Sequence, residues 1–483
     1  MKRDPLPRMA DTSASDTTTI VGVDTATASA TGRPRVVIVG GGFGGLSAAR
    51  ALGNRDVDVL VLSRTSYHGF WMMLYQVAAA QLEPESIATP VRAMLRRFHN
   101  TRFRIAEVRG VDLERKLVLT EDEEIPYGYL ILAAGSTTNY FGNDRFSART
   151  LGLHDVAEAE QLRDRVLAAF ERAAGEPDPE KRAALMSIAI IGGGPTGVEL
   201  AGAFAELIDR AFRKDYPELD TSMARVVLVE SNKRLLGTFP ARLQRSALRK
   251  LERLGVQVRL GVAVADIVGD TVVLADGDRI AAHTVVWSAG VRGAPLADGL
   301  GVALGRGARV RVTPALNLPE RPEVFVIGDM AYLENERGEP YPMVAQVALQ
   351  MGKRAGRNVL ALARGRETRE FHYFDIGQMA MVGRGAALFD SFGVHLAGVL
   401  GWLIWLFIHL VNLPGMRNRL AVATSWIYTI VSGDPGVRAA TAERAEARVP
   451  APALAMTVGK PVLKPVAALP SRGESARERK RAA

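Results

Sequence analysis

Short apolar runs alternate with amphipathic stretches along most of the chain. Residues 35–39 form a β-branched run typical of a strand buried on both faces, and glycines and a helical pattern follow at once. The same order returns at residues 187–191. We expect further strands at 57–62, 130–134, 226–229, 256–260, 285–287 and 324–327, and a helix at 155–185. This alternation predicts a mostly parallel, doubly wound α/β architecture that occurs twice.

A different pattern begins at Ser391, where 26 residues up to Met416 contain no Asp, Glu, Lys or Arg. This length is enough to cross a bilayer. Six residues recur every three or four positions, as on one face of a helix: His395, Gly398, Trp402, Trp405, His409 and Asn412. We expect amphipathic helices at 391–432 that lie on one membrane leaflet, with this face toward the headgroups. A buried core helix is the alternative.

Both ends of the chain have compositions typical of disorder. Residues 1–33 are rich in Thr, Ser, Ala and Asp and lack the apolar core of a signal peptide. Residues 433–483 are mainly Ala, Pro and basic residues. The formal net charge is +9, and from Arg417 onwards 12 Lys and Arg stand against 5 Asp and Glu. Because the excess charge lies mostly in this tail, we expect attraction to anionic lipid and no nucleic-acid partner.

Length and composition limit the chemistry. A chain of 483 residues that is 48% apolar can form several domains. It contains no cysteine, which excludes disulfides, iron–sulfur clusters and catalytic dithiols. We expect no metal site. Any redox reaction must therefore be carried by a bound organic cofactor.

Two glycine-rich turns follow the two apolar runs. Both fit the Gly-x-Gly-x-x-Gly fingerprint of Rossmann-like dinucleotide-binding domains, the first through Gly40, Gly42, Gly44 and Gly45, the second through Gly192, Gly194 and Gly197. In this fingerprint one glycine makes the tight turn, one lets a pyrophosphate approach the backbone, and one packs helix on strand. Two such turns predict two dinucleotides and electron transfer from one to the other.

An acid at the end of the second strand of such a unit usually accepts the ribose hydroxyls. In the second unit this residue is Glu230, whose charge would repel a 2′-phosphate, so NADH is expected rather than NADPH. The equivalent place in the first unit holds Ser63 and Arg64. Arg64 there could accept a phosphate or stack on adenine, or simply be a solvated surface residue.

Several further segments form a recognisable set. They are LYQVA at 74–78, AAG at 133–135, GVE at 197–199, VWSAGV at 286–291, IGDMA at 327–331, AQVALQ at 345–350 and the Trp402, Trp405 and His409 pattern. With them, residues 35–430 resemble the type II NADH dehydrogenases, monotopic NADH:quinone oxidoreductases of the two-dinucleotide flavoprotein superfamily. The glycine turns alone indicate the superfamily, whereas the paired glutamines and VWSAG are more specific.

The resemblance implies FAD in the first unit, NADH in the second, and a quinone that reaches the flavin from the membrane side, with the protein on the cytoplasmic side of the cell membrane. It places Asp329 on the ribityl or pyrophosphate part of FAD, Glu199 beside nicotinamide and flavin, and Gln346 with Gln350 in the quinone pocket. The remaining matched positions at the cofactors are Ala134, Gly135, Gly290 and Gly328. The implied FAD domain is formed by 34–150 and 293–390, and the NADH domain by 151–292.

Two departures from the family pattern stand out. Ser63 replaces a common acid, and Trp71, Met72 and Met73 replace Gln-Pro-Leu next to the expected isoalloxazine. His68, just upstream, is interpreted as structural. The missing cysteines exclude disulfide reductases and sulfide:quinone oxidoreductases, which use a cysteine pair.

Two other functions fit the same residues. One is a soluble NAD(P)H-dependent flavoprotein reductase that serves a protein partner, in which 391–431 is core or dimer interface. The other is a non-catalytic flavoprotein that senses NADH. The sequence leaves open whether the protein forms a homodimer and which quinone it uses.

Overall fold

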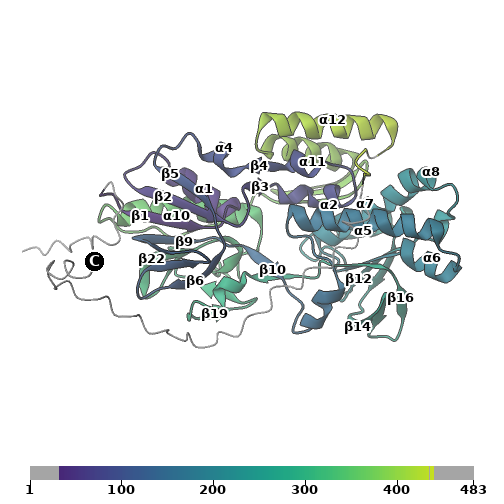
Figure 1. The fold of residues 1–483 in the computed structure, drawn as a ribbon, viewed down its shortest axis with the longest axis horizontal. Coiled ribbons are helices and arrows are strands. Elements are labelled where there is room, and N and C mark those ends of the chain that lie inside the picture. Colours follow the sequence, from purple (N-terminus) through teal and green to yellow (C-terminus); the bar gives the residue numbers. More distant parts are fainter. Residues whose placement is uncertain (1–31, 435, 440–483) are drawn as a thin grey trace, which may run out of the picture.

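A computed structural model describes residues 32–434 and 436–439. Its first large sheet has the strand order β21-β22-β9-β1-β2-β5 (Figure 1). All neighbours are parallel except the β21 and β22 pair. The strands are β1 (Arg35–Val39), β2 (Asp58–Ser63), β5 (Thr101–Ile105), β9 (Tyr129–Leu132), β21 (Asn317–Leu318) and β22 (Arg321–Val326).

The second sheet repeats this arrangement with parallel strands in the order β13-β12-β11-β17. Its strands are β11 (Ile188–Ile191), β12 (Val226–Glu230), β13 (Gln257–Leu260) and β17 (Thr284–Trp287). In each sheet the strand before a glycine turn is flanked by the next strand of its unit and by a later one, so the order reverses beside it. The predicted doubly wound α/β architecture, present twice, is confirmed.

Smaller antiparallel sheets join and extend the two units. They are β3 (Tyr67–Gly69) with β4 (Ala88–Pro90); β6 (Val108–Asp112), β7 (Leu117–Thr120) and β8 (Glu124–Pro126); β10 (Ser136–Thr138) with β18 (Val291–Gly293); β14 (Val264–Val268), β15 (Thr271–Leu274) and β16 (Arg279–Ala281); and β24 (Gln378–Gly383), β25 (Ala386–Ser391) and β26 (Val394–Gly398). A mixed sheet contains β19 (Leu304–Gly305), β20 (Arg309–Arg311) and β23 (Ala331–Tyr332). The pair β10 and β18 lies between the two large sheets (Figure 1).

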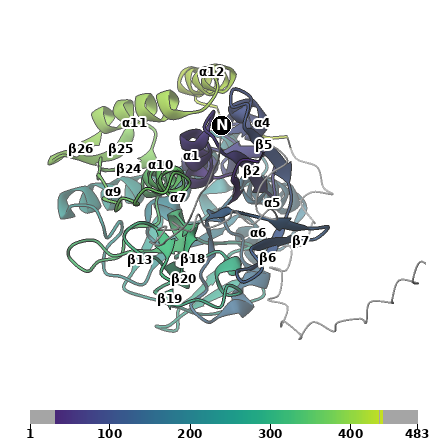
Figure 2. The ribbon, with the colours of Figure 1, turned by 90° about the vertical axis from the view of Figure 1, so that its left-hand side faces the viewer.

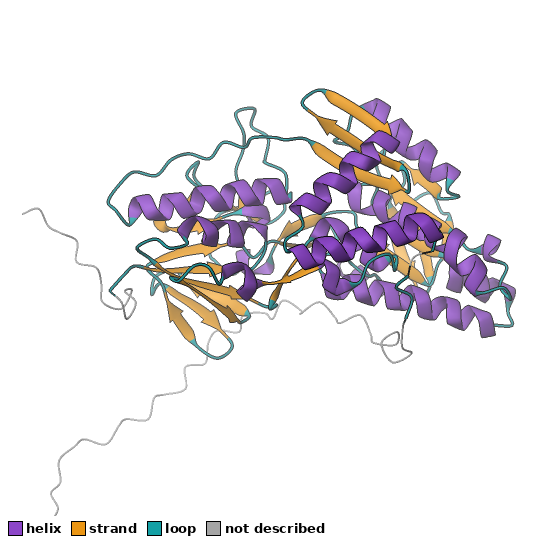
Figure 3. Cartoon of the chain, turned by 90° about the horizontal axis from the view of Figure 1, so that it is seen from above, coloured by secondary structure: helices purple, strands orange, loops and turns teal. Residues whose placement is uncertain are grey.

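Helices cover both large sheets, as the view from above shows (Figure 3). They are α1 (Phe43–Leu52), α2 (Leu74–Ala78), α3 (Pro84–Ile87), α4 (Val91–Leu95), α5 (Val156–Gly175), α6 (Pro179–Met186), α7 (Pro195–Leu207), α8 (Arg213–Asp215), α9 (Ala241–Arg253), α10 (Ala345–Leu362), α11 (Val399–Asn412) and α12 (Met416–Ser432). A single helix predicted at 155–185 is in fact two, α5 and α6. The break follows from Pro177 and Pro179, and Asp178 caps the second helix by accepting from Glu180 N.

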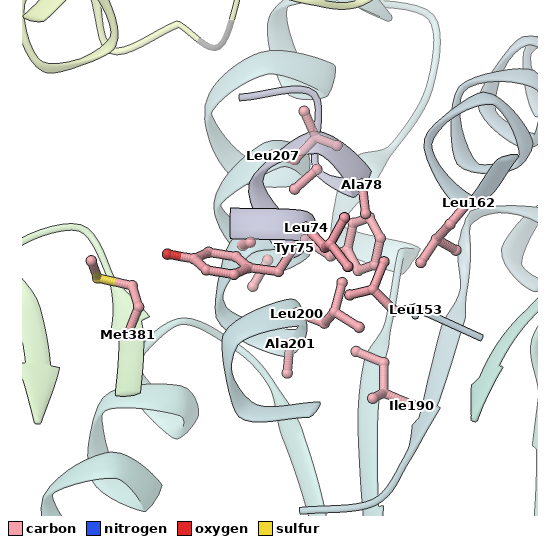
Figure 4. Close-up of a cluster of buried hydrophobic side chains, with 14 of the residues drawn as sticks. Leu74, Tyr75, Ala78, Leu153, Leu162, Ile190, Leu200, Ala201, Leu207 and Met381 are labelled. Atoms are coloured by element: carbon pink, nitrogen blue, oxygen red, sulfur yellow. The ribbon is translucent and has the colours of Figure 1, made fainter. Parts of the chain in front are cut away.

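Helix α10 packs closely along α1 (Figure 2). Small residues allow this approach, because a Cβ atom on Gly352 would lie 2.2 Å from Gly44 O and one on Gly356 would lie 2.8 Å from Ala51 Cβ. Helix α2 packs into a hydrophobic core with α5, α7 and β11, in which Leu74 and Tyr75 are buried (Figure 4). This core joins the N-terminal part of the chain to the second unit.

The sequence predicted a helix across 391–416, but the first third of this stretch is not helical. Residues 394–398 form strand β26, which pairs with β25 through a turn at Phe392 and Gly393, and only Val399 starts a helix. Gly398 has φ +84°, a conformation that separates strand from helix. His395 therefore does not share a helix face with the others, and its Nδ1 lies 2.8 Å from Asp390 Oδ1.

The prediction that the face with Trp405 and His409 points toward the headgroups is also wrong. Trp405 and His409 are only 1% and 8% exposed, their rings stack at 3.8 Å, and they pack against Tyr75 and Phe70 of the protein itself. The opposite face of α11 is exposed and apolar, with Phe407 68% exposed. Within the described ranges, no helix is long and apolar enough to cross a membrane. Most of the predicted leader and basic tail lies outside the described residues.

Candidate functional site: two glycine turns and a cavity beneath the C-terminal helices

The first glycine turn connects β1 to α1 at the point where the sheet order reverses. Gly40 has φ +116°, and a Cβ atom on it would lie 2.1 Å from Ala133 O; one on Gly45 would lie 1.9 Å from Gly40 O. Gly42 is the N-cap of α1 and supplies no side-chain cap. Gly40 N donates to Leu62 O, whereas the N–H groups at the start of α1 have no partner within the helix and can face an anionic group such as a pyrophosphate.

The second turn has the same geometry. Gly192 has φ +115°, and a Cβ atom on Gly197 would lie 1.9 Å from Gly192 O. Gly194 caps α7 and has open space where a side chain would stand, with no atom within 4 Å of an added Cβ. Both turns therefore fit the cradle that a dinucleotide requires.

Glu230 lies at the end of β12, directly beside the second turn. Its Oε2 accepts a hydrogen bond of 2.6 Å from Gly193 N, and its Oε1 accepts one of 2.7 Å from Asn232 N. In the first unit Ser63 occupies the matching place, since a Cβ atom on Gly41 would lie 2.9 Å from Ser63 Oγ. Arg64 follows at the end of β2 and is exposed. The equivalence of Ser63 and Glu230 inferred from the sequence is thus visible in the fold.

Further residues named from the sequence gather at the carboxyl ends of the strands. Asp329 follows β22 and accepts a hydrogen bond of 2.7 Å from Ser136 Oγ, and burial raises the pKa of its carboxyl. The structure brings the following residues to the same strand ends as the two turns: Ala134 and Gly135 after β9, Gly290 after β17, and Gly328 after β22. Gly135 and Gly328 both have positive φ, at +75° and +65°.

Trp71 lies over the first turn. A Cβ atom on Gly42 would lie 3.7 Å from Trp71 Cη2, and one on Gly135 would lie 4.0 Å from the same atom. His68 behind it is buried, with Nδ1 3.3 Å from Gly41 O, and burial lowers its pKa to about 4. A neutral imidazole bonded to the turn backbone has a structural role.

A cavity that is open to solvent, with about 740 Å³ of empty space, lies beneath the C-terminal helices. Its walls come from α2, α7, β24, α11 and α12, and its lining includes Tyr75, Gln76, Glu199, Glu206, Arg210, Met381, Arg384, Trp402, Leu406, Trp426 and Ile430. Figure 4 shows the Tyr75 hydroxyl pointing toward Met381 on β24. The cavity thus extends from the helices that carry the exposed apolar face to the helix that follows the second glycine turn.

Two carboxyl groups on α7 line this cavity. Glu199 and Glu206 are seven residues apart, so both lie on the same face of α7. Glu199 Oε1 accepts a hydrogen bond from Met381 N at 3.0 Å, and Glu206 Oε1 accepts one from Arg384 N at 2.7 Å. Burial raises the pKa of Glu199 to about 8 and that of Glu206 above its usual range. Glu199 is therefore largely protonated at neutral pH.

The sequence reasoning missed Glu206. The one signal for it is a second acid, seven residues after Glu199, in a helix that is otherwise almost entirely apolar. The helix continues directly into a π-helical turn at Ile208–Phe212, which carries Arg210 of the cavity wall. Such turns are frequent at functional sites.

Gln346 and Gln350 lie near the start of α10 but are not among the residues that line this cavity. Gln346 donates to Gly377 O at 3.2 Å and accepts from the Tyr373 hydroxyl at 3.2 Å. Gln350 donates to Phe374 O at 2.8 Å and accepts from Phe374 N at 3.0 Å. Both glutamines thus hold the 373–377 segment, which exposes Phe374 and Ile376.

Comparison with known proteins agrees with this geometry. Residues 34–352 match the pyridine nucleotide-disulphide oxidoreductase family. The type II NADH:quinone oxidoreductase Ndh of Mycobacterium tuberculosis is 39% identical over 431 residues, which cover 86% of this chain and 92% of that protein. The chain belongs to the type II NADH:quinone oxidoreductases. A second type II NADH:quinone oxidoreductase of that organism, NdhA, is 37% identical over 435 residues, with the same coverage of both chains.

Solved structures support the fold of this type II enzyme. The NDH2 of Plasmodium falciparum, solved in complex with NADH, superposes with a TM-score of 0.77 over 82% of this chain and 98% of that chain, at 17% identity. The sulfide:quinone oxidoreductase of Aquifex aeolicus superposes with a TM-score of 0.64 over 82% and 94%, at 18% identity. Identity this low shows a shared fold alone.

Proposed function

We propose that the protein oxidises NADH through FAD and reduces a quinone that enters from one membrane leaflet beneath α11 and α12. The observation that carries the proposal is the cavity that extends from these helices to Glu199, beside the second glycine turn. FAD, when bound, accepts a hydride from NADH and passes two electrons on to the quinone. FAD belongs on the first glycine turn and NADH on the second.

The chain's own residues hold the two dinucleotides. Backbone N–H groups at Gly42 and Gly194 face the two pyrophosphates, and Glu230 is placed to accept the ribose hydroxyls of NADH. Asp329 uses Oδ2 for Ser136, which leaves Oδ1 for the ribityl or pyrophosphate part of FAD. The 34–150 and 293–390 segments form the FAD domain in this assignment, and 151–292 the NADH domain.

Glu199 is the group placed to supply a proton in the cavity. Its carboxyl stays protonated at neutral pH, and the hydrogen bond from Met381 N fixes Oε1, so Oε2 carries the proton. Trp402, Leu406 and Trp426 give the cavity an apolar wall that excludes bulk water. Gln346 and Gln350 act by holding the exposed 373–377 segment, which leads into β24 of the cavity wall.

The exposed apolar face of the two helices is proposed to lie on the cytoplasmic leaflet. Its residues include Val399, Leu400, Leu403, Phe407 and Val411 on α11 and Met416, Leu420, Ile427 and Val431 on α12. An apolar surface of this kind on a folded protein indicates a membrane or a protein partner. Arg417 beside it is exposed and is suited to anionic headgroups.

A set of activity measurements tests the proposal. NADH oxidation is measured with a water-soluble quinone in buffer and with a long-chain quinone in vesicles. Replacement of two exposed residues, Leu403→Gln with Phe407→Gln, should leave the first activity unchanged and reduce the second about tenfold or more. Val268→Gln, on β14 of the second unit and also exposed, is the control away from this face and should change neither activity.

The two alternatives predict other results. A soluble reductase that serves a protein partner would keep its activity in the double variant as in the control, and it would not bind vesicles. A sensor would be reduced by NADH but would show no steady-state turnover with either quinone. A homodimer built on the same apolar face would dissociate in the Leu403→Gln and Phe407→Gln variant, which sedimentation measures.

A further inference from the structure

Helix α9 of the second unit carries a row of exposed cations. Arg242, Arg245, Arg249 and Arg253 follow one another at spacings of three and four residues, so they form one stripe on the helix surface. Among the residues that the structure describes, no carboxylate lies within ion-pair distance of any of the four. The known reaction assigns no role to this stripe.

A cavity lies between this helix and the antiparallel sheet β24, β25 and β26. It is a cleft open to solvent, with about 530 Å³ of empty space, and its lining consists of Ser246, Lys250, Arg253, Val382, Gly385, Ala386, Ala387, Leu388, Gly398 and Val399. Two cationic side chains and a hydroxyl come from α9, and the lining contains no acidic residue. Lys250 Nζ donates a long hydrogen bond, 3.4 Å, to Arg384 O, and its charge also acts on the carboxyl of Glu206. The cavity is therefore suited to an anion.

The other wall of this cavity belongs to the exposed apolar face. Val399, at the start of α11, is 59% exposed, and Leu400 next to it is 64% exposed. A molecule with its anionic group beside Lys250 and Arg253 could lay an apolar chain along these residues and on toward Leu403. This combination of charge and adjacent apolar surface matches an anionic phospholipid.

We propose that this cavity binds the phosphate of an anionic phospholipid at the membrane surface. The inference rests on the proposed contact of α11 and α12 with a leaflet. Charge-assisted hydrogen bonds from Lys250 and Arg253 hold the phosphate, and the remaining arginines of α9 attract the surrounding anionic surface. Free inorganic phosphate has the same chemistry, and the experiment separates the two sources.

Binding of the full chain to vesicles tests the proposal. Vesicles of phosphatidylcholine alone are compared with vesicles of equal parts phosphatidylcholine and phosphatidylglycerol, for the wild type and for Lys250→Gln with Arg253→Gln. The double variant should bind the anionic vesicles about thirtyfold more weakly, as the loss of two juxtamembrane cations implies. Its binding to neutral vesicles and its activity with a water-soluble quinone should be unchanged.

A charge-matched control distinguishes a site from general attraction. Arg213→Gln with Lys214→Gln removes two exposed cations from α8, away from the cavity. This variant should bind anionic vesicles as the wild type does. If it loses as much affinity as the cavity variant, or if the cavity variant loses none, the proposal is overturned.

Three further outcomes show which part of the proposal fails. If inorganic phosphate stabilises the wild type against heating but not the cavity variant, and vesicle binding is equal in both, the site takes free phosphate and the lipid proposal is overturned. If the wild type binds neither vesicle, the proposed membrane contact itself fails, and this inference fails with it. Equal wild-type binding to neutral and anionic vesicles overturns only the anionic site.

Discussion

The indole N–H of Trp426 donates a hydrogen bond of 2.9 Å to Oε1 of Gln76, across 350 residues of sequence. Gln76 in turn donates to the Tyr75 hydroxyl at 2.8 Å, so α12 is tied to α2 through a chain of polar groups at the cavity wall. This bond connects the C-terminal helices to the core that α2 shares with α7. The position of the proposed membrane face thus depends on residues of α2.

Replacing Trp426 with Phe should weaken this connection. Gln76 is buried, so its Oε1 would lose its partner, at a cost of about 1–3 kcal/mol. We expect a lower melting temperature and a higher KM for quinone, with little change in the KM for NADH. Tyr428→Phe, on the exposed face of the same helix, is the control and should change neither. Equal changes in both KM values would contradict a local role.

Glu230→Gln should improve the use of NADPH. The neutral side chain no longer repels the 2′-phosphate, and its remaining oxygen can still accept from Asn232 N. The ratio of kcat/KM for NADPH to that for NADH should rise about tenfold, equivalent to about 1.4 kcal/mol. Glu180→Gln, exposed on α6 of the same unit, is the matched control. Similar wild-type efficiency with both nucleotides would count against the assignment.

Gly42→Val and Gly194→Val should separate the two dinucleotide sites. Neither added Cβ meets protein closer than 3.7 Å, so both variants should fold, with the side chain in the space for one pyrophosphate. Gly42→Val should lose its flavin absorbance, whereas Gly194→Val should stay yellow and no longer be bleached by NADH. Gly175→Val, at the exposed end of α5, should do neither. Equal loss of FAD from both site variants would show that the assignment of the sites is wrong.

The raised pKa of Glu199 predicts a pH-dependent stability. Because burial raises the pKa from an ordinary 4.5 to about 8, the folded protein holds this proton more tightly than the unfolded chain. Its contribution is therefore fully favourable below pH 4.5 and is lost as the pH rises through about 8, on the order of 1.4 kcal/mol per pKa unit. Glu199→Gln should flatten this fall in melting temperature between pH 4.5 and about pH 8.

The same variant separates stability from chemistry. Quinone reduction should slow in Glu199→Gln because the amide supplies no proton, while reduction of the flavin by NADH, followed by stopped flow, should persist. Exposed Glu107→Gln should leave the pH dependence of both rate and melting temperature as in the wild type. A wild-type slope that survives in Glu199→Gln would assign the titration to another group.

Local sequence patterns predicted the two sheets because each signal is local. A buried strand, a glycine with positive φ and a helix follow one another within about fifteen residues at Gly40 and again at Gly192. Glu230 lies 37 residues from Gly193, so its place beside the turn was inferred from the strand order that such a unit adopts and not from a local contact. The comparisons confirm the family.

The features that the sequence pattern missed depend on contacts between residues far apart in the chain. The uncharged run at 391–416 fits a helix by composition, but pairing of β26 with β25 and the positive φ of Gly398 make its first part a strand. Trp405 and His409 face inward because Tyr75 and Phe70, more than 300 residues earlier, offer them a surface. Glu206 joins Glu199 in a cavity only because β24 and α12 close over α7.

The order of strands in the first sheet also determines when its parts can come together during synthesis. Strand β22 pairs with β9 although Val324 and Leu130 are separated by the whole second unit, while β11, β12, β13 and β17 all lie within residues 188–287. The unit translated second is therefore complete before the unit translated first. On the ribosome, the first sheet is therefore completed only after β22 has been translated.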